Sequence, residues 1–285
     1  MGYKNPKIWS IFNLEPVQAV VLGIVQGLTE FLPVSSSGHL VIFQHLFGLK
    51  ETELVFDVAV HVGTLIAVVI YFKKDLAAII AALVKMTGRL TRGQAKLTDA
   101  WSDPDVKLAL LIVLSSIPTA LIGLGFHQVA DRIFSSVRMV GLMLLVTGAV
   151  IWATRWMEKT GHGVKRFSAG KALIVGFVQG LAILPGISRS GSTIAVGLFL
   201  GLKRDLAVRY SFLLSLPAIS GAALLAARDV SRGGDFSAGI IFTGMLSAAV
   251  VGYLSLKLLV FIVKKGQLYL FSPYCWVVGG LALFL

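Results

Sequence analysis

Residues 25–40 read VQGLTEFLPVSSSGHL, and a diverged copy of this stretch lies in the second half of the chain. A shift of 153 residues places residues 23–38 on residues 176–191, and half of these sixteen positions are identical. Each copy sets an apolar, helix-like run before a polar turn that ends at a glycine. Both turns fall where the hydropathy indicates membrane, and non-helical backbone is costly in lipid. The sequence therefore predicts two membrane-buried turns that serve a function.

The composition excludes a soluble globular protein. Of the 285 residues, 56% are hydrophobic and only 14% are charged, and the mean hydropathy is +0.85. This leaves too little polar surface to cover a globule. Apolar runs near the ~20 residues that cross a bilayer recur from end to end. We therefore predict an all-α polytopic membrane protein with a single transmembrane domain, residues 1–285, built from internal repeats at approximately 15–156 and 168–285.

The formal net charge of +12 is interpreted as a topology signal. Lys and Arg lie mainly in loops between apolar segments, where they orient a membrane protein and contact anionic lipids. We therefore expect membrane lipids as partners and no nucleic acid. The single cysteine, Cys275, excludes an internal disulfide and a cysteine-based metal site.

Six spans and two broken helix pairs are expected. Neither part of a broken pair is long enough to cross the membrane, so each pair predicts a re-entrant hairpin whose turn is buried in protein or lines a cavity. The predicted hairpins combine 16–32 with 39–47, and 171–184 with 192–202. The predicted spans are 54–72, 106–126, 138–156, 210–227, 238–263 and 268–285.

The distribution of basic residues orients these elements. The segments 73–107 and 155–171 are rich in Lys and Arg, so the positive-inside rule assigns them to the cytoplasm. The first part of 73–107 also has the pattern of an amphipathic helix. Three spans follow each hairpin, so the two repeats point in opposite directions, as in inverted-repeat transporters whose binding site lies between the repeats. We therefore expect the two polar turns to meet near the middle of the membrane.

The two turns carry side chains suited to phosphate. Arg189 lies in a turn that leads into a helix, where a planar guanidinium, backbone N–H groups and the helix dipole all favour a tetrahedral anion. Ser35, Ser36 and Ser37 lie within one turn of His39, which can exchange a proton with a serine nucleophile or a leaving group. The other hydroxyl groups of the second turn belong to Ser188, Ser190, Ser192 and Thr193.

Glu30 is costly in a bilayer unless it is paired or faces water. It shares a helix face with Gln26, and it can orient the imidazole, position a water or hold a divalent cation against a diphosphate, the last being preferred. A simple ion pair with Arg189 that locks the repeats together is the structural alternative. Asp57 and His61 also share a helix face. They are expected to support the site residues, to form an auxiliary metal site, or to cap the span at the membrane interface.

These residues resemble the bacterial undecaprenyl-diphosphate phosphatases, also called bacitracin-resistance proteins. The family's glutamate motif, [E/Q]xxxE followed by FLPVSS[ST]GH, is matched by residues 26–39, and its PGxSRSxxT motif is matched by residues 185–193. The stretches FDVAVHVGT and SFLLSLPA are also similar. Position 26 holds Gln where many relatives hold Glu, so a carboxylate role is excluded there.

The resemblance implies an integral membrane phosphatase that hydrolyses undecaprenyl diphosphate to undecaprenyl phosphate and inorganic phosphate, which recycles the lipid carrier of cell-wall synthesis. It implies that Glu30, assisted by Gln26, binds a divalent cation such as Mg²⁺ or Ca²⁺. It also implies Ser36 as the nucleophile and His39 as the acid or base. Arg189 would clamp the phosphates, with further phosphate-binding groups on Ser35, Ser37, Ser188, Ser190 and Thr193.

A multi-pass protein of the bacterial inner membrane is implied, and we expect its site to open to the periplasmic side because the first hairpin enters from outside. The competing function is an inverted-repeat transporter or flippase for an anionic or phosphorylated lipid. The neighbouring serine and histidine favour hydrolysis, because a carrier needs no nucleophile. The sequence leaves open whether a serine or an activated water attacks, whether the product is flipped, and whether the protein is a homodimer.

Overall fold

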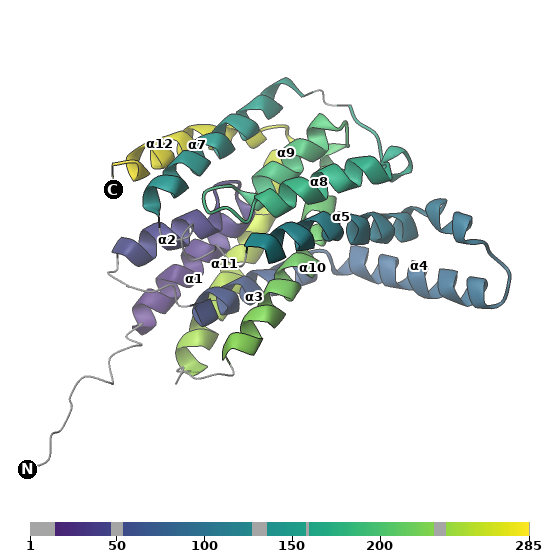
Figure 1. Ribbon diagram of the computed structural model, residues 1–285, viewed down its shortest axis with the longest axis horizontal. Coiled ribbons are helices and arrows are strands. Elements are labelled where there is room, and N and C mark those ends of the chain that lie inside the picture. The colour runs from purple at the N-terminus through teal and green to yellow at the C-terminus, as the bar shows by residue number, and fades with distance from the viewer. Residues whose placement is uncertain (1–14, 47–53, 127–135, 158–159, 231–237, 285) are drawn as a thin grey trace, which may run out of the picture.

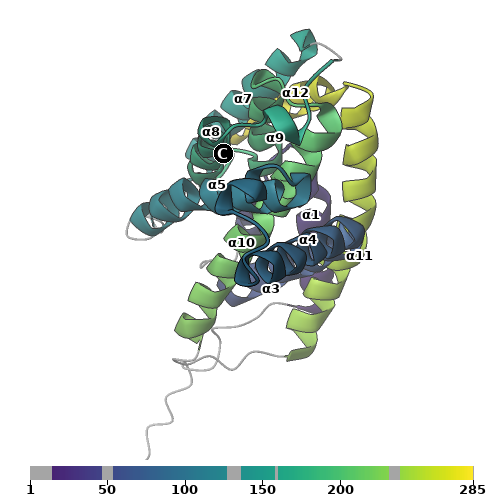
Figure 2. The same ribbon diagram turned by 90° about the vertical axis from the view of Figure 1, so that its right-hand side faces the viewer.

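A computed structural model describes residues 15–46, 54–126, 136–157, 160–230 and 238–284, and the regular elements in these ranges are helices (Figures 1 and 2). The α-helices are α1 (Pro16–Phe31), α2 (Ser36–Leu46), α3 (Leu54–Tyr71), α4 (Lys73–Thr91), α5 (Pro104–Phe126), α7 (Val137–Trp152), α8 (Ala169–Leu181), α9 (Arg189–Phe199), α10 (Arg204–Val230), α11 (Ala238–Lys264) and α12 (Ser272–Ala282). Short 3₁₀ helices are η1 (Leu97–Trp101), η2 (Ala153–Trp156), η3 (Val164–Arg166) and η4 (Leu268–Phe271).

Both predicted helix breaks are present, and each has a local cause. After α1, Leu32 adopts extended backbone (φ −61°, ψ 142°), because the residue before a proline is disfavoured in the helical region. Ser35 then takes a left-handed conformation with φ 69°, and α2 begins at the next residue. After α8, the reversal uses Gly186 with φ 97°, which glycine tolerates. Ser188 caps α9 by accepting the N–H of Gly191 at its side chain.

Five of the six predicted spans coincide with long helices. Among the described residues, four helices are long and apolar enough to cross a membrane: α5, α7 continued by η2, α10 and α11. The fifth candidate is α3, which together with α4 forms a pair bent by 73°. The chain is therefore a polytopic helical membrane protein.

The sixth predicted span, 268–285, is wrong in its extent. The chain forms η4 and then α12, which together make an apolar helix, Leu268–Ala282, that is too short to count as a span. The predicted end at residue 285 lies outside the described residues. With 11 residues, α12 is about 16 Å long, compared with ~30 Å of hydrocarbon. Pro273 stands in the first turn of α12, where its missing N–H starts a new helix instead of continuing the preceding one. Hydropathy alone does not register this interruption.

Glycines allow the closest helix contacts. A Cβ atom on Gly23 of α1 would lie 2.4 Å from the carbonyl oxygen of Gly244 in α11. A Cβ atom on Gly176 of α8 would lie 2.0 Å from the carbonyl oxygen of Ser115 in α5. Figure 1 shows α8 lying along α5 and α12 lying along α7. These contacts bring the ends of α1 and α8, where the two turns begin, into the centre of the molecule.

The amphipathic helix predicted after the first span is confirmed as α4. Its buried face includes Ile79 and Met86, while Lys85 and Arg89 are exposed. Met86 packs with Ala100 in a small cluster separate from the main core. In Figure 1, α4 extends beyond the other helices beside the beginning of α5.

Candidate active site

The two turns contact each other directly, as the repeat predicts. The backbone N–H of Gly186 in the second turn donates to Oγ of Ser35 in the first, at 3.0 Å. Oγ of Ser37 lies 3.4 Å from the same Ser35 oxygen. A Cβ atom on Gly191 would lie 2.9 Å from Cβ of Pro33. Residues 151 positions apart are therefore joined across the repeat boundary.

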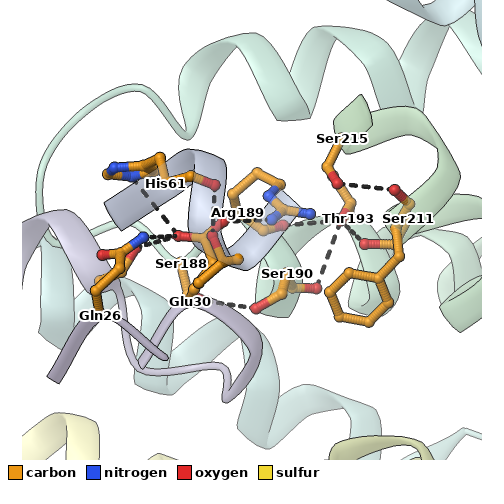
Figure 3. A network of polar contacts seen from close by, with 12 residues as sticks. Gln26, Glu30, His61, Ser188, Arg189, Ser190, Thr193, Ser211 and Ser215 are labelled. Atoms are coloured by element: carbon orange, nitrogen blue, oxygen red, sulfur yellow. Dashed lines mark hydrogen bonds and ion pairs between the residues drawn. The ribbon is translucent and has the colours of Figure 1, made fainter. Parts of the chain in front are cut away.

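Glu30, at the end of α1, is the centre of the polar network (Figure 3). Its carboxylate is 7% exposed and accepts from Arg189 Nη2 at 2.6 Å on Oε1. On Oε2 it accepts from Ser36 Oγ at 2.6 Å and from Gln26 Nε2 at 3.0 Å. Nε2 of His61 lies 3.7 Å from the same Oε2. Four elements, α1, α2, α3 and α9, therefore place side chains on one carboxylate.

Arg189 keeps donor capacity beyond its ion pair. Its Cζ atom lies 5.5 Å from the ring centroid of Phe212, so the aromatic face holds the guanidinium plane. Nη1 is buried and has no hydrogen-bond partner in the described part of the chain. A buried donor without an acceptor is costly. An anionic oxygen placed beside Nη1 would satisfy it.

Ser36 and His39 lie on one helix but have different partners. The Ser36 hydroxyl donates to Glu30, whereas Nδ1 of His39 is 2.8 Å from the carbonyl oxygen of Ser35 and Nε2 is 2.7 Å from the hydroxyl of Tyr274. A carbonyl only accepts, so Nδ1 carries the proton and Tyr274 donates to Nε2. The expected histidine–serine contact is therefore replaced by a carboxylate–serine contact.

The other predicted phosphate donors are mostly occupied within the protein. Ser188 Oγ caps α9 and lies 3.3 Å from Ser190 Oγ. Thr193 Oγ1 donates to the Arg189 carbonyl at 2.8 Å and lies 2.6 Å from Ser211 Oγ on α10. Figure 3 shows this chain of hydroxyl groups leading away from Glu30. These side chains hold the second turn in place.

Thr147 on α7 is a residue that the sequence did not single out. Its Oγ1 donates to the carbonyl of Gly186 at 2.8 Å and accepts the N–H of Ser188 at 3.0 Å. Both bonds fix the backbone of the second turn. A lone threonine in an apolar span carries no signal in a single sequence, because its role depends on which helix packs beside it.

The structure brings His61 to the site and supports it from Asp57. Nδ1 of His61 is 2.6 Å from the backbone carbonyl of Asp57, so Nδ1 donates and Nε2 is the nitrogen that faces Glu30. The contact between the predicted pair joins the His61 ring to the Asp57 backbone, and His61 is a direct neighbour of the central carboxylate.

The donor atoms fit a divalent cation in part. Among the described residues, no group of three or more His, Cys, Asp or Glu side chains is close enough to hold a metal ion. Oε1 of Gln26, however, is a buried acceptor without a partner in this part of the chain, beside the Glu30 carboxylate. Amide and carboxylate oxygens are the ligands that Mg²⁺ and Ca²⁺ prefer.

Comparison with known proteins identifies the family that the chain resembles. The family model described as "Bacitracin resistance protein BacA" matches residues 19–281. An undecaprenyl-diphosphatase from Desulfosudis oleivorans is 54% identical over 272 residues, which cover 95% of this chain and 99% of the relative. Proteins of the same name from Desulfatibacillum aliphaticivorans and Methanosphaera stadtmanae are 48% and 42% identical, over 94% and 95% of this chain and 97% and 98% of the relatives.

Proposed function

The chain belongs to the bacitracin resistance protein BacA family, and we propose that it hydrolyses undecaprenyl diphosphate to undecaprenyl phosphate and inorganic phosphate. Its similarity to proteins named undecaprenyl-diphosphatase extends over nearly the whole chain. The reaction recycles the lipid carrier of cell-wall synthesis. The observation that carries this proposal is the hydrogen bond of 2.6 Å from Ser36 Oγ to Glu30 Oε2, on a carboxylate that also binds Arg189.

Ser36 is the proposed nucleophile. Its hydroxyl oxygen attacks the terminal phosphorus, the bond from that phosphorus to the bridging oxygen breaks, and the electron pair leaves with undecaprenyl phosphate. The hydroxyl proton passes to Glu30, which already accepts it in a hydrogen bond. Water then attacks the phosphoserine, the Ser36 oxygen takes its proton back from Glu30, and inorganic phosphate is released. A transporter would need the anion site but not this serine–carboxylate pair.

Arg189 is the proposed phosphate clamp. Its free Nη1 supplies a donor to a phosphate oxygen, and the guanidinium offsets the charge that builds up during transfer. Ser35, Ser37, Ser188, Ser190 and Thr193 position the turns around it. A divalent cation, Mg²⁺ or Ca²⁺, held by Glu30 and Gln26 would neutralise further charge on the diphosphate.

His39 keeps its proposed acid–base role only in a second arrangement. Its Nε2 is engaged by Tyr274, so its ring must leave that hydroxyl before it can exchange a proton with substrate. We therefore assign both transfers of the Ser36 proton to Glu30. His39, once released, is proposed to take a proton from the attacking water and to return it to the released phosphate. His61, whose Nε2 lies 3.7 Å from Glu30 Oε2, is the proposed neighbour that helps to position this carboxylate.

The proposed architecture is an inverted repeat with two re-entrant hairpins. The helix α1 packs on α11 of the second repeat, and α8 packs on α5 of the first. The glycines at the two contacts, Gly23 and Gly176, are 153 positions apart, which is the repeat shift. Such reciprocal packing is what a pseudo-two-fold axis in the membrane plane produces. We further propose an inner-membrane location with the site open to the periplasm.

Phosphate release from a polyprenyl diphosphate by the purified protein tests the proposed activity. We expect release that is abolished by a chelator and restored by a divalent cation. Activity that is indifferent to chelation would remove the cation from the proposal. Absence of phosphate release, together with retained binding of the diphosphate lipid, would favour the carrier.

A further inference from the structure

A basic groove lies at the end of the helix bundle where α5 and α8 begin and α9 ends. Its volume is about 820 Å³, and it is lined by the 160–166 segment, Pro104, Gly201 and Lys203. Three of the lining side chains are cations, Lys165, Arg166 and Lys203, and none of the lining residues is acidic. All three cations are exposed. None of the hydrogen bonds of the Glu30 network involves a residue of this groove.

The walls of the groove are tied together by backbone hydrogen bonds. The N–H of His162 donates to the carbonyl of Gly201 at 2.9 Å, and the N–H of Lys203 donates to the carbonyl of His162 at 3.1 Å. From α5, the Lys107 ammonium donates to the carbonyl of Lys165 at 2.9 Å. The groove is therefore fixed by the fold before any ligand enters.

His162 contributes a donor that the protein does not satisfy. The Lys171 ammonium lies 3.0 Å from His162 Nε2 and donates to the carbonyl of Leu200 at 2.8 Å. An ammonium only donates, so Nε2 accepts and Nδ1 carries the proton. Nδ1 is buried and has no partner in the described part of the chain. A buried N–H on the groove wall without an acceptor is costly.

Three described carboxylates lie within two residues of the groove lining, and each has a partner within the protein. Asp103 and Asp105 flank Pro104, but Asp103 Oδ1 accepts the N–H groups of Asp105 and Val106 at 3.0 and 3.1 Å. Asp105 Oδ1 accepts from Arg209 at 3.2 Å. Asp205, two residues after Lys203, is paired with Lys264 at 3.3 Å. Because none of these carboxylates is paired with Lys165, Arg166 or Lys203, the three cations remain available to an entering anion.

We infer that this groove is a second anion site that binds a phosphate group. An arginine fork and two lysine ammonium groups suit the several acceptor oxygens of a phosphate. The source of the phosphate is either free inorganic phosphate or the headgroup of an anionic phospholipid. The groove lies at the same end of the bundle as Lys264, which pairs with Asp205, two residues after Lys203. Clusters of basic residues at such an end attract anionic headgroups.

The test compares the purified full-length protein with a triple variant, Lys165→Gln, Arg166→Gln and Lys203→Gln. The matched control is Lys85→Gln with Arg89→Gln, which removes two exposed basic residues of α4 that do not line the groove. Inorganic phosphate is titrated by calorimetry in detergent. In a second arm, each protein is reconstituted in nanodiscs of phosphatidylglycerol or phosphatidylcholine. The nanodiscs are then dissolved in detergent, and the lipid molecules that stay bound to the protein are counted by native mass spectrometry.

We expect the triple variant to lose one bound phosphate equivalent, or to raise its Kd at least tenfold, while the control stays within twofold of wild type. Retention of phosphatidylglycerol that requires the groove residues identifies a headgroup, and phosphate binding without lipid retention identifies free phosphate. Equal binding by wild type and the triple variant overturns the site. An equal loss of phosphate binding in the control also overturns the site, because the loss would then come from the lower overall positive charge and not from the groove. The single variant Lys203→Glu should weaken binding in the same direction without removing three side chains.

Discussion

The carboxylate of Glu30 connects residues from both halves of the chain. It accepts from Ser36 of the first half and from Arg189 of the second, and it is nearly buried. A buried charge is stable only when it is paired and hydrogen-bonded. The same contacts that neutralise Glu30 also place a hydroxyl and a guanidinium where phosphate chemistry needs them.

Replacing Ser36 by alanine removes the proposed nucleophile. We expect Ser36→Ala to lower kcat by at least about a hundredfold, because no neighbouring group can form the covalent intermediate in its place. Ser37→Ala is the matched control, since Ser37 has only a 3.4 Å contact with Ser35, and it should retain activity within a fewfold. Phosphate release measures both. Equal, mild losses would point to an activated water as the nucleophile.

Arg189→Lys tests whether the planar fork matters. Lysine retains the positive charge but has a single nitrogen. It therefore cannot donate to Glu30 from one nitrogen and to phosphate from a second, parallel one, as Nη2 and Nη1 of Arg189 can. We expect kcat/KM to fall by roughly a hundredfold, since charge-assisted bonds to phosphate are strong. Near-normal turnover in detergent would remove the clamp from the proposal.

The contact between His39 and Tyr274 gives another prediction. Tyr274→Phe keeps the stacked ring, whose centroid is 5.7 Å from that of His39, but releases Nε2. If His39 must leave Tyr274 to exchange protons, kcat should be unchanged or higher in Tyr274→Phe. His39→Gln should lower kcat at least about tenfold. A loss in Tyr274→Phe as large as that in His39→Gln would show that His39 works only through the tyrosine.

At the scale of elements, the site depends on helices that stop inside the protein. The interruption after α1 uses Leu32, Pro33 and Ser35, and the interruption before α9 uses Gly186 and Ser188. Each break leaves backbone groups that the helix cannot satisfy. One of them, the N–H of Gly186, is paired across the two turns with Ser35 Oγ, and Thr147 of α7 pairs two others in the second turn. Helix termination therefore contributes directly to the assembly of the site.

The close approach of α8 to α5 gives an element-scale prediction. Gly176→Ala would place a Cβ atom 2.0 Å from the Ser115 carbonyl oxygen, a backbone atom that cannot move freely. We expect destabilisation of about 1–3 kcal/mol, typical of overpacking, seen as a lower melting temperature in detergent. Gly170→Ala on the same helix is the control, because a Cβ atom there meets nothing within 4 Å. Equal melting temperatures for the two variants would contradict the tight contact.

At the scale of the molecule, the arrangement of the helices decides which residues meet. The four long helices and the bent pair of α3 and α4 surround the two broken pairs, and Figure 2 shows α11 along one side of the bundle. Glu30 and Arg189 are 159 positions apart. Only packing of one repeat against the other brings them to hydrogen-bonding distance.

The orientation of α11 tests the proposed topology. Positive-inside reasoning puts Ala238 outside and Lys264 in the cytoplasm, and both residues are exposed. In intact cells, a membrane-impermeant maleimide should label Ala238→Cys and should not label Lys264→Cys until the cells are lysed. The native Cys275 is buried, so background labelling should be low. The reverse pattern would invert the topology.

The sequence by itself determined the membrane class, the places where the two helices break and the side chains of the site. Hydropathy identifies spans, and proline, glycine and serine in local sequence dictate where a helix ends. The repeat shift also predicted that the two turns meet. The length of the last helix could not be predicted from hydropathy, because the apolar run continues beyond Ala282, where the helix ends.

Tertiary structure alone decided which partner each side chain takes. Periodicity assigns Ser36 and His39 to a helix. In the structure, the Ser36 hydroxyl donates to Glu30, and the His39 imidazole is hydrogen-bonded to Tyr274, 235 positions away. Thr147 and His61 became part of the site for the same reason. A hydrogen bond depends on distances and angles between helices, and these are set by packing over the whole molecule, which no local pattern contains.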